Sequence, residues 1–170
     1  MAISLIQVSQ VALKLGDIVE SPWVKLLSLC RKIPMLAMIR PSIVNLNTHR
    51  AEVITRFSPL TKNHVGSMYF GALCAGSEVT AGLLALHVAD KRNAKVVILF
   101  KAVKGNFLRR ATSDVVFVCE DGEPLTNAVV TAVTRKERVN LWVMVHGYAE
   151  ERGKQVKVTE FELEVSIKAT

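Results

Sequence analysis

The chain has 170 residues, 50% of them hydrophobic and 22% charged, which suits one domain with a full core and excludes a disordered protein. The formal net charge of +7 favours anionic partners, but only 6% of the residues are aromatic and no long basic run occurs, which disfavours nucleic acid. The three cysteines (Cys30, Cys74 and Cys119) form no CxxC pair, which indicates a reducing cytoplasm without disulfides or a zinc site.

The first predicted helix covers residues 21–34. Ser21 is a suitable N-cap, Pro22 suits the first helical position, and Pro34 should end the helix. Before this helix, residues 1–17 lack the basic region and the cleavage site of a signal peptide. Secretion is therefore not expected.

Six strands are predicted from the alternation of apolar and polar residues. They cover residues 43–47, 51–57, 95–108, 112–120, 139–150 and 157–169. Gly105 suggests a bulge or a bend in the third of these strands. A short helix at residues 123–139 separates the fourth strand from the fifth.

A long apolar helix at about residues 67–89 lies between the second and the third strand. A helix that is apolar nearly all round must be enclosed, so we predict an α+β fold in which a curved antiparallel sheet wraps around it. We expect residues 1–34 to form an N-terminal segment and helix that pack on the domain, and residues 35–170 to form that single domain.

Glu78 is the only formally charged residue between His64 and Ala89, near the middle of the apolar helix. An unpaired ionised carboxylate in apolar surroundings costs on the order of several kcal/mol, so such an acid is neutralised, paired or used in chemistry. The segment is long enough to span a membrane, but a glutamate at the bilayer centre would lack a partner, which favours a buried helix and no membrane. The structural alternative is a carboxylate paired with a buried Lys, Arg or Tyr, or held protonated.

The loop before this helix reads Asn63–His64–Val65–Gly66–Ser67. A helix N-terminus presents free N–H groups that suit an anion or a polarised carbonyl oxygen, and Asn63 adds a side-chain amide at the same place. The alternative is that Asn63 and Ser67 only shape the loop and cap the helix.

The stretch NHVGSMYFGAL, followed by a helix of small residues that carries Glu78, resembles the hotdog-fold acyl-CoA thioesterases of the PaaI type. It looks closest to an uncharacterised hotdog branch that keeps the wording NHxGSMYxGAL, and the resemblance covers nearly all of the chain. This resemblance implies a homodimer whose sheets join edge to edge, which can double into a homotetramer. It also implies active sites at the dimer interface, an acyl-CoA thioester as the substrate, and neither a metal nor a resident cofactor.

Aligned without gaps, the family's Asn falls on Asn63, its next Gly on Gly66 and its acid on Glu78. The family's His-Gly-Gly falls on Tyr69–Phe70–Gly71, so the histidine and the middle glycine are not kept. By this resemblance Glu78 is the catalytic base or nucleophile, and Asn63 is its electrophilic partner. The substrate-binding candidates are His64, Gly66, Ser67, Tyr69, Phe70 and Gly71.

Two rival functions stay open. The missing His-Gly-Gly favours a non-catalytic hotdog module that binds an acyl or aromatic ligand. A basic protein associated with nucleic acid is the second rival, and salt-sensitive binding to duplex would reveal it. If coenzyme A binds, part of the positive charge can meet its phosphates; the candidate contacts are Arg109, Arg110, Arg135 and Lys136.

Overall fold

The computed structural model describes residues 21–170, and the expectations for the segment before Ser21 lie outside this part of the chain. Along the chain the elements are α2 (Pro22–Lys32), α3 (Pro34–Ile39), β1 (Ser42–Leu46), β2 (Ala51–Thr55), α4 (Phe70–Lys91), β3 (Val96–Phe107), β4 (Val115–Cys119), α5 (Gly122–Arg135), β5 (Arg138–Glu151) and β6 (Lys154–Ala169). The six predicted strands, the long helix and the short helix are all present. The predicted α+β architecture is therefore confirmed.

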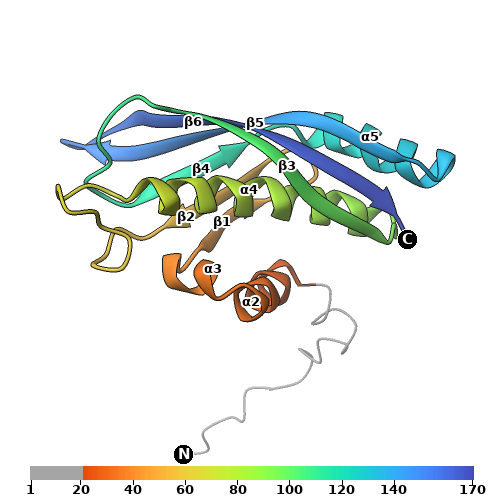
Figure 1. The fold of residues 1–170 in the computed structure, drawn as a ribbon, viewed down its shortest axis with the longest axis horizontal. Coiled ribbons are helices and arrows are strands. Elements are labelled where there is room, and N and C mark those ends of the chain that lie inside the picture. Colours follow the sequence, from red (N-terminus) through yellow and green to blue (C-terminus); the bar gives the residue numbers. More distant parts are fainter. Residues whose placement is uncertain (1–20) are drawn as a thin grey trace, which may run out of the picture.

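The six strands form one antiparallel sheet in the order β1-β2-β4-β5-β6-β3. Within residues 21–170, β3 pairs with β6 on one side only, so its other side is an edge of the sheet in the described part of the chain. The sheet curves over α4, and α2 with α3 lies on the opposite side of that helix (Figure 1). α5 packs against α4, β5 and β6. A curved sheet wrapped around one long helix is the hotdog arrangement.

α4 is the central helix of the core. Its most apolar stretch has a mean hydropathy of 1.5 and is long enough to cross a membrane, but 72% of that stretch is buried inside the domain. The buried hydroxyls of Ser77 and Thr80 donate to carbonyl oxygens one turn back, at Cys74 (2.7 Å) and Gly76 (2.8 Å). The buried apolar surface and these two paired hydroxyls are what is expected of a core helix in a globular domain.

One face of α4 packs tightly against β4 at Gly76. A Cβ atom on Gly76 would lie 2.8 Å from both Cδ2 and Cζ of the Phe117 ring, which is fully buried. No side chain fits in this space, so a glycine here lets the helix approach the sheet closely.

The sequence predicted that the helical region ends at Pro34, but a second helix follows directly. Pro34 ends α2 but also begins α3, because proline has no N–H to lose at the first turn of a helix. Ile33 is extended between the two helices, and Ser21 occupies the N-cap position of α2 without a side-chain bond. Leu36 and Ile39 of α3 are buried against the domain. The predicted boundary between an N-terminal part and a single domain at residue 35 stays a prediction.

The bulge in β3 lies at Lys101 and not at Gly105. The register with β6 shifts between Phe100 and Ala102, which leaves Lys101 as the extra residue. Because of this shift, Phe100 and Val103 both face α4, whereas regular alternation would put them on opposite faces of the sheet.

Gly105 makes room for an aromatic ring instead. It pairs directly with Phe161 on β6, and a Cβ atom on Gly105 would lie 2.7 Å from Cδ1 of that ring. The glycine of this strand therefore serves cross-strand packing and not a change of register.

Candidate active site

Glu78 lies in the middle of α4, on the side that faces β3 and the two N-terminal helices. It is the only exposed residue of this helix between Gly71 and Ala89, so it is less buried than its apolar neighbours suggested. Within residues 21–170 its carboxylate has no hydrogen-bond or ion-pair partner, which argues against the alternative of a paired structural acid. Partial burial among apolar side chains raises the pKa of the Glu78 carboxyl above its ordinary value of 4.5.

Two pockets meet at Glu78 and share only Glu78 and Phe100. The first, named the Lys101 pocket, has a volume of about 390 Å³ and is lined by Met35, Gly71, Cys74, Ala75, Glu78, Phe100, Lys101, Ala102, Val103 and Leu163. The second, named the apolar pocket, has a volume of about 400 Å³ and is lined by Leu29, Ile33, Leu36, Glu78, Val79, Gly82, Leu86, Ile98, Leu99 and Phe100. The carboxylate therefore borders both halves of a groove between α4 and β3.

Asn63 organises the loop before α4 with its own side chain. Its Oδ1 accepts hydrogen bonds from the N–H groups of Val65 (3.1 Å) and Ser67 (3.0 Å), and its Nδ2 donates to Ser67 Oγ (3.0 Å). Gly66 has a φ of +80°, a conformation that favours glycine. These contacts agree with the loop-shaping alternative for Asn63 and Ser67, but an amide has two N–H groups, so one remains for a further acceptor.

The first turn of α4 has two open donors. The helix begins at Phe70 with Tyr69 as its N-cap, and not at about residue 67. No hydrogen bond within residues 21–170 uses the backbone N–H of Phe70 or Gly71. The ring of Tyr69 lies against this turn, since a Cβ atom on Gly71 would come within 2.5 Å of Tyr69 Cε1. Gly71 thus allows Tyr69 to fold back over the start of the helix.

A third pocket, named the Asn63 pocket, lies beside this first turn and has a volume of about 420 Å³. Of the predicted site residues it brings together Asn63, His64, Ser67, Tyr69 and Phe70. Phe107 at the end of β3 completes its apolar wall, 6.5 Å from Phe70 between ring centres.

The other predicted site residues lie elsewhere in the same protomer. Gly71 and Glu78 line the Lys101 pocket, and Gly66 lines none of the three pockets. Gly71 and Glu78 are seven residues apart on α4, which corresponds to about 10 Å along the helix axis. Asn63 lies before this helix, so a single protomer does not bring it to Glu78.

The four basic candidates divide into two pairs. Arg109 and Arg110 line the Asn63 pocket, and Arg110 also donates to the carbonyl oxygen of Val65 in the loop. Arg135 and Lys136 lie at the C-terminal end of α5 and line none of the three pockets. Only the first pair is therefore positioned to meet a ligand that extends from the groove.

The sequence did not predict that Lys101, α2 and α3 line the two pockets at Glu78. Lys101 interrupts the apolar run VVILF at the bulge, which is a signal that could have been read. Leu29, Ile33 and Leu36 gave no such signal, because their contact with α4 and β3 arises only when the two N-terminal helices fold back on the domain.

Other reactive groups offer weaker chemistry. Burial raises the pKa of the Cys74 thiol and raises the pKa of Cys119 to about 12, so neither is a ready nucleophile near neutral pH. Among residues 21–170 no cluster of three or more His, Cys, Asp or Glu side chains could hold a metal ion.

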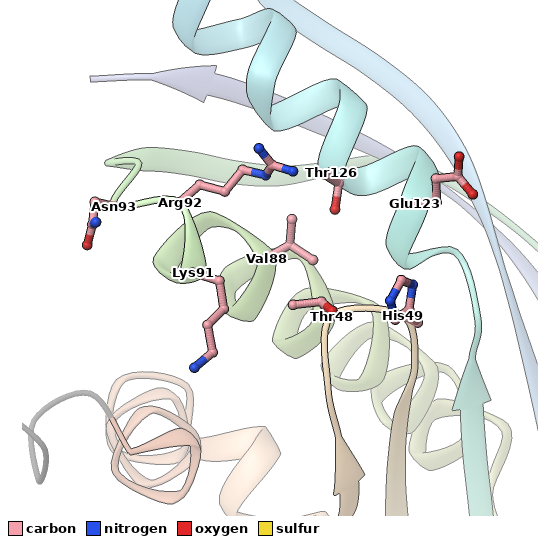
Figure 2. Close-up of a pocket in the computed structure, with 8 residues that line it drawn as sticks. All are labelled: Thr48, His49, Val88, Lys91, Arg92, Asn93, Glu123 and Thr126. Carbon is pink, nitrogen blue, oxygen red and sulfur yellow. The ribbon is translucent and has the colours of Figure 1, made fainter.

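A polar pocket of about 580 Å³ lies at the other end of α4, between the β1–β2 hairpin and the start of α5 (Figure 2). None of the predicted site residues lines this pocket. Its lysine, Lys91, extends away from His49 and Glu123 (Figure 2), so the charged groups do not converge on one point. This pocket is therefore separate from the groove at Glu78.

A family model described as "Domain of unknown function (DUF4442)" matches residues 23–165. The chain belongs to this family. The match confirms the resemblance of NHVGSMYFGAL to an uncharacterised hotdog branch. A comparison with curated proteins found no significant match for this DUF4442 chain.

Solved structures show the same fold. This DUF4442 chain is similar to a thioesterase candidate from Shewanella oneidensis, with a TM-score of 0.73, 14% identity, and coverage of 86% of this chain and 97% of the other. It is also similar to a Pseudomonas aeruginosa protein of unknown function described as a thioesterase candidate, with a TM-score of 0.72, 21% identity and coverage of 88% and 97%. A thioesterase family protein from Silicibacter pomeroyi has a TM-score of 0.66, 15% identity and coverage of 88% and 100%. The DUF4442 chain therefore has the hotdog fold.

Proposed function

We propose that this protein is a thioesterase that hydrolyses an acyl-CoA, with Glu78 as its general base. The observation that carries this proposal is a carboxylate with a raised pKa, without a partner in residues 21–170, at the junction of two pockets. A carboxyl group whose pKa is raised toward neutrality can accept and return a proton more effectively near pH 7. The thioesterase descriptions of structures with the same fold support the proposal.

The proposed reaction begins with a water molecule between Glu78 and the thioester carbonyl carbon. Glu78 takes a proton from the water, and the hydroxide oxygen bonds to the carbonyl carbon to give a tetrahedral oxyanion. Backbone N–H groups of Phe70 and Gly71, together with the free N–H of Asn63, stabilise this oxyanion. The C–S bond then breaks, and the leaving thiolate takes the proton from Glu78. The products are a carboxylic acid and coenzyme A.

The site requires a second copy of the chain. A thioester carbonyl must lie within hydrogen-bond distance of both the base and the oxyanion donors, and about 10 Å of helix separates Glu78 from Gly71 within one protomer. In the described part of the chain β3 has an unpaired edge that a partner could join, with Val97, Leu99 and Val103 exposed along this strand. A two-fold axis beside this edge would run two α4 helices antiparallel, so that the first turn of one approaches Glu78 of the other.

The phosphate groups of coenzyme A are expected to bind where positively charged side chains lie near the site. Arg109 and Arg110 beside the Asn63 pocket are suited to its phosphate groups, because guanidinium groups bind phosphate oxygens in pairs. Acyl-CoA thioesters and free thiols are compatible with a reducing compartment, so we expect the protein to act in the cytoplasm.

The test is hydrolysis of a panel of acyl-CoAs, followed by the release of free thiol. Glu78→Gln should lower kcat/KM by about 100-fold or more, because it removes the base and keeps the shape. Glu123→Gln, at the remote polar pocket, is the matched control and should leave turnover unchanged. Equal turnover by Glu78→Gln and the unaltered protein would refute the assignment of the base.

The second candidate function is a non-catalytic module that binds an acyl or aromatic ligand. The observation that favours it is the ring of Tyr69, which covers the first turn of α4 where the related enzymes have His-Gly-Gly. In that case no acyl-CoA is hydrolysed, but acyl ligands still raise the melting temperature.

A further inference from the structure

We propose that the apolar pocket binds an aliphatic acyl chain, that α2 and α3 form its outer wall, and that Gly82 and Leu86 determine the chain length it accepts. This inference rests on the proposed function, because it assigns the two halves of the Glu78 groove to the two ends of an acyl-CoA.

The lining of the apolar pocket decides the chemistry of its occupant. Except for Glu78 at its mouth, every lining residue is an aliphatic residue, a glycine or Phe100. Apart from the Glu78 carboxylate, these side chains offer no hydrogen-bond partner to the amide groups of the pantetheine arm, and burying such a group without a partner is costly. An alkyl chain loses nothing by entering, and each buried methylene strengthens binding about fourfold.

The opposite half of the groove has the properties expected for the coenzyme end. The Lys101 pocket continues from Glu78 toward the first turn of α4 at Gly71, and it carries a lysine at the bulge of β3. In the proposed dimer the first turn of the partner's α4 approaches Glu78, and the Asn63 pocket beside that turn brings two arginine side chains to the same site. Among the residues that line the two halves of the groove the single cation is Lys101, so positive charge lies on one side of Glu78 and orients a substrate that is anionic at one end and apolar at the other.

The N-terminal helices supply the outer wall. Leu29 and Ile33 at the end of α2 and Leu36 of α3 line the apolar pocket, facing Ile98 and Leu99 of β3. These helices therefore add an outer wall to the groove between α4 and β3, which gives a partly open channel of about 400 Å³, a size typical of small-molecule sites.

Gly82 and Leu86 occupy successive turns of α4 along this channel, one turn and two turns beyond Glu78. A Cβ atom on Gly82 would approach only the Phe100 ring, at 3.7 Å, which is an ordinary contact. A side chain at position 82 therefore enters the pocket without distorting the helix. Of the α4 residues that line this pocket, Leu86 lies farthest along the helix from Glu78, so shortening it should lengthen the channel.

The experiment compares Gly82→Leu, Leu86→Ala and Cys74→Leu with the unaltered protein. Butanoyl-, octanoyl-, dodecanoyl- and hexadecanoyl-CoA are tested as substrates, and their non-hydrolysable thioether analogues as ligands by titration calorimetry. Gly82→Leu should weaken binding of the long chains on the order of 50-fold, for about three excluded methylenes, and leave the butanoyl compound unchanged. Leu86→Ala should shift the preference toward longer chains. Gly82→Ala, with a smaller shift in the same direction, provides a milder variant if the leucine impairs folding.

Cys74→Leu is the control, because it enlarges a side chain of the Lys101 pocket, on the other side of Glu78. It should weaken all chain lengths by one common factor. A chain-length effect in Cys74→Leu with none in Gly82→Leu would overturn the proposal, as would affinity independent of chain length. If binding depends on chain length but no substrate is hydrolysed, the proposed hydrolysis is refuted and the assignment of the apolar pocket to the acyl chain stands. If substrates are hydrolysed at rates that do not depend on chain length, the proposed hydrolysis stands and the assignment of the pocket is refuted.

Discussion

Two glycines on α4 offer a direct test of how this helix is packed. Replacing a glycine with alanine in a helix interior stabilises it by about 1 kcal/mol, because the unfolded chain loses freedom. Gly82 has space for a methyl group, with Phe100 at 3.7 Å, so Gly82→Ala should raise the free energy of unfolding by up to about 1 kcal/mol. Its single new methyl should also leave the butanoyl substrate unaffected.

Gly76 should respond in the opposite direction. Its new methyl would lie 2.8 Å from two ring atoms of Phe117, and that ring has little room to move, because it is fully buried and packs over the backbone of Gly147 in β5. Overpacking of this kind costs about 1–3 kcal/mol, which outweighs the gain in helix propensity. Gly76→Ala should therefore be less stable than Gly82→Ala by about 1–3 kcal/mol, because the gain in helix propensity is common to both variants.

Urea unfolding at one fixed protein concentration measures both values, since association would otherwise change the apparent stability. The slope with denaturant should stay the same while the midpoints move apart. Similar shifts of both midpoints in one direction would show that α4 does not have one tight and one open face. The argument for an open channel at Gly82 would then fail as well.

Three further predictions follow from the site. Because the folded pKa of Glu78 is raised, folding favours its protonated form, so the free energy of unfolding should fall as pH rises from 4.5 through the folded pKa; Glu78→Gln should remove this fall in melting curves between pH 4 and pH 8. Gly66→Ala should cost about 1–2 kcal/mol, because its φ of +80° is strained for alanine; an unchanged urea midpoint would contradict this. Cys119, with a pKa of about 12 and no exposure, should react with a thiol reagent at pH 8 only after unfolding, whereas reaction in the native protein at the rate of Cys74 would refute its burial.

Much of the fold could be predicted, because the alternation of apolar and polar residues identifies the strands and the length of the apolar run identifies the central helix. β6 shows this well: Phe161, Leu163, Val165 and Ile167 are buried at every second position, as the sequence pattern required. α3 was missed because Pro34 both stops one helix and starts another, and local sequence does not distinguish the two roles.

The candidate site was harder to predict because it depends on contacts between distant segments. Glu78 stood out in an apolar run, and the loop at Asn63 was located correctly. The distance between these two residues within one protomer follows from the position of each on or before α4. The bulge at Lys101 follows from how β3 fits β6, and the wall at Leu29 from how α2 folds back on α4. Neither arrangement has a local signature in the sequence.

The turn between β5 and β6 has a consequence for the order in which the protein can assemble. Arg152 and Gly153 both have positive φ, at 51° and 77°, and this tight turn joins the two longest strands of the sheet. Closing so short a loop costs little entropy, so this hairpin can form early and independently of the rest. β3 then takes its register from β6, with Phe100 opposite Val165. A slip of one residue at the turn would reverse which side chains of β6 face the core. Because β3 pairs with β6, the slip would also change how β3 lies beside Glu78, so the geometry of the groove depends on a turn outside it.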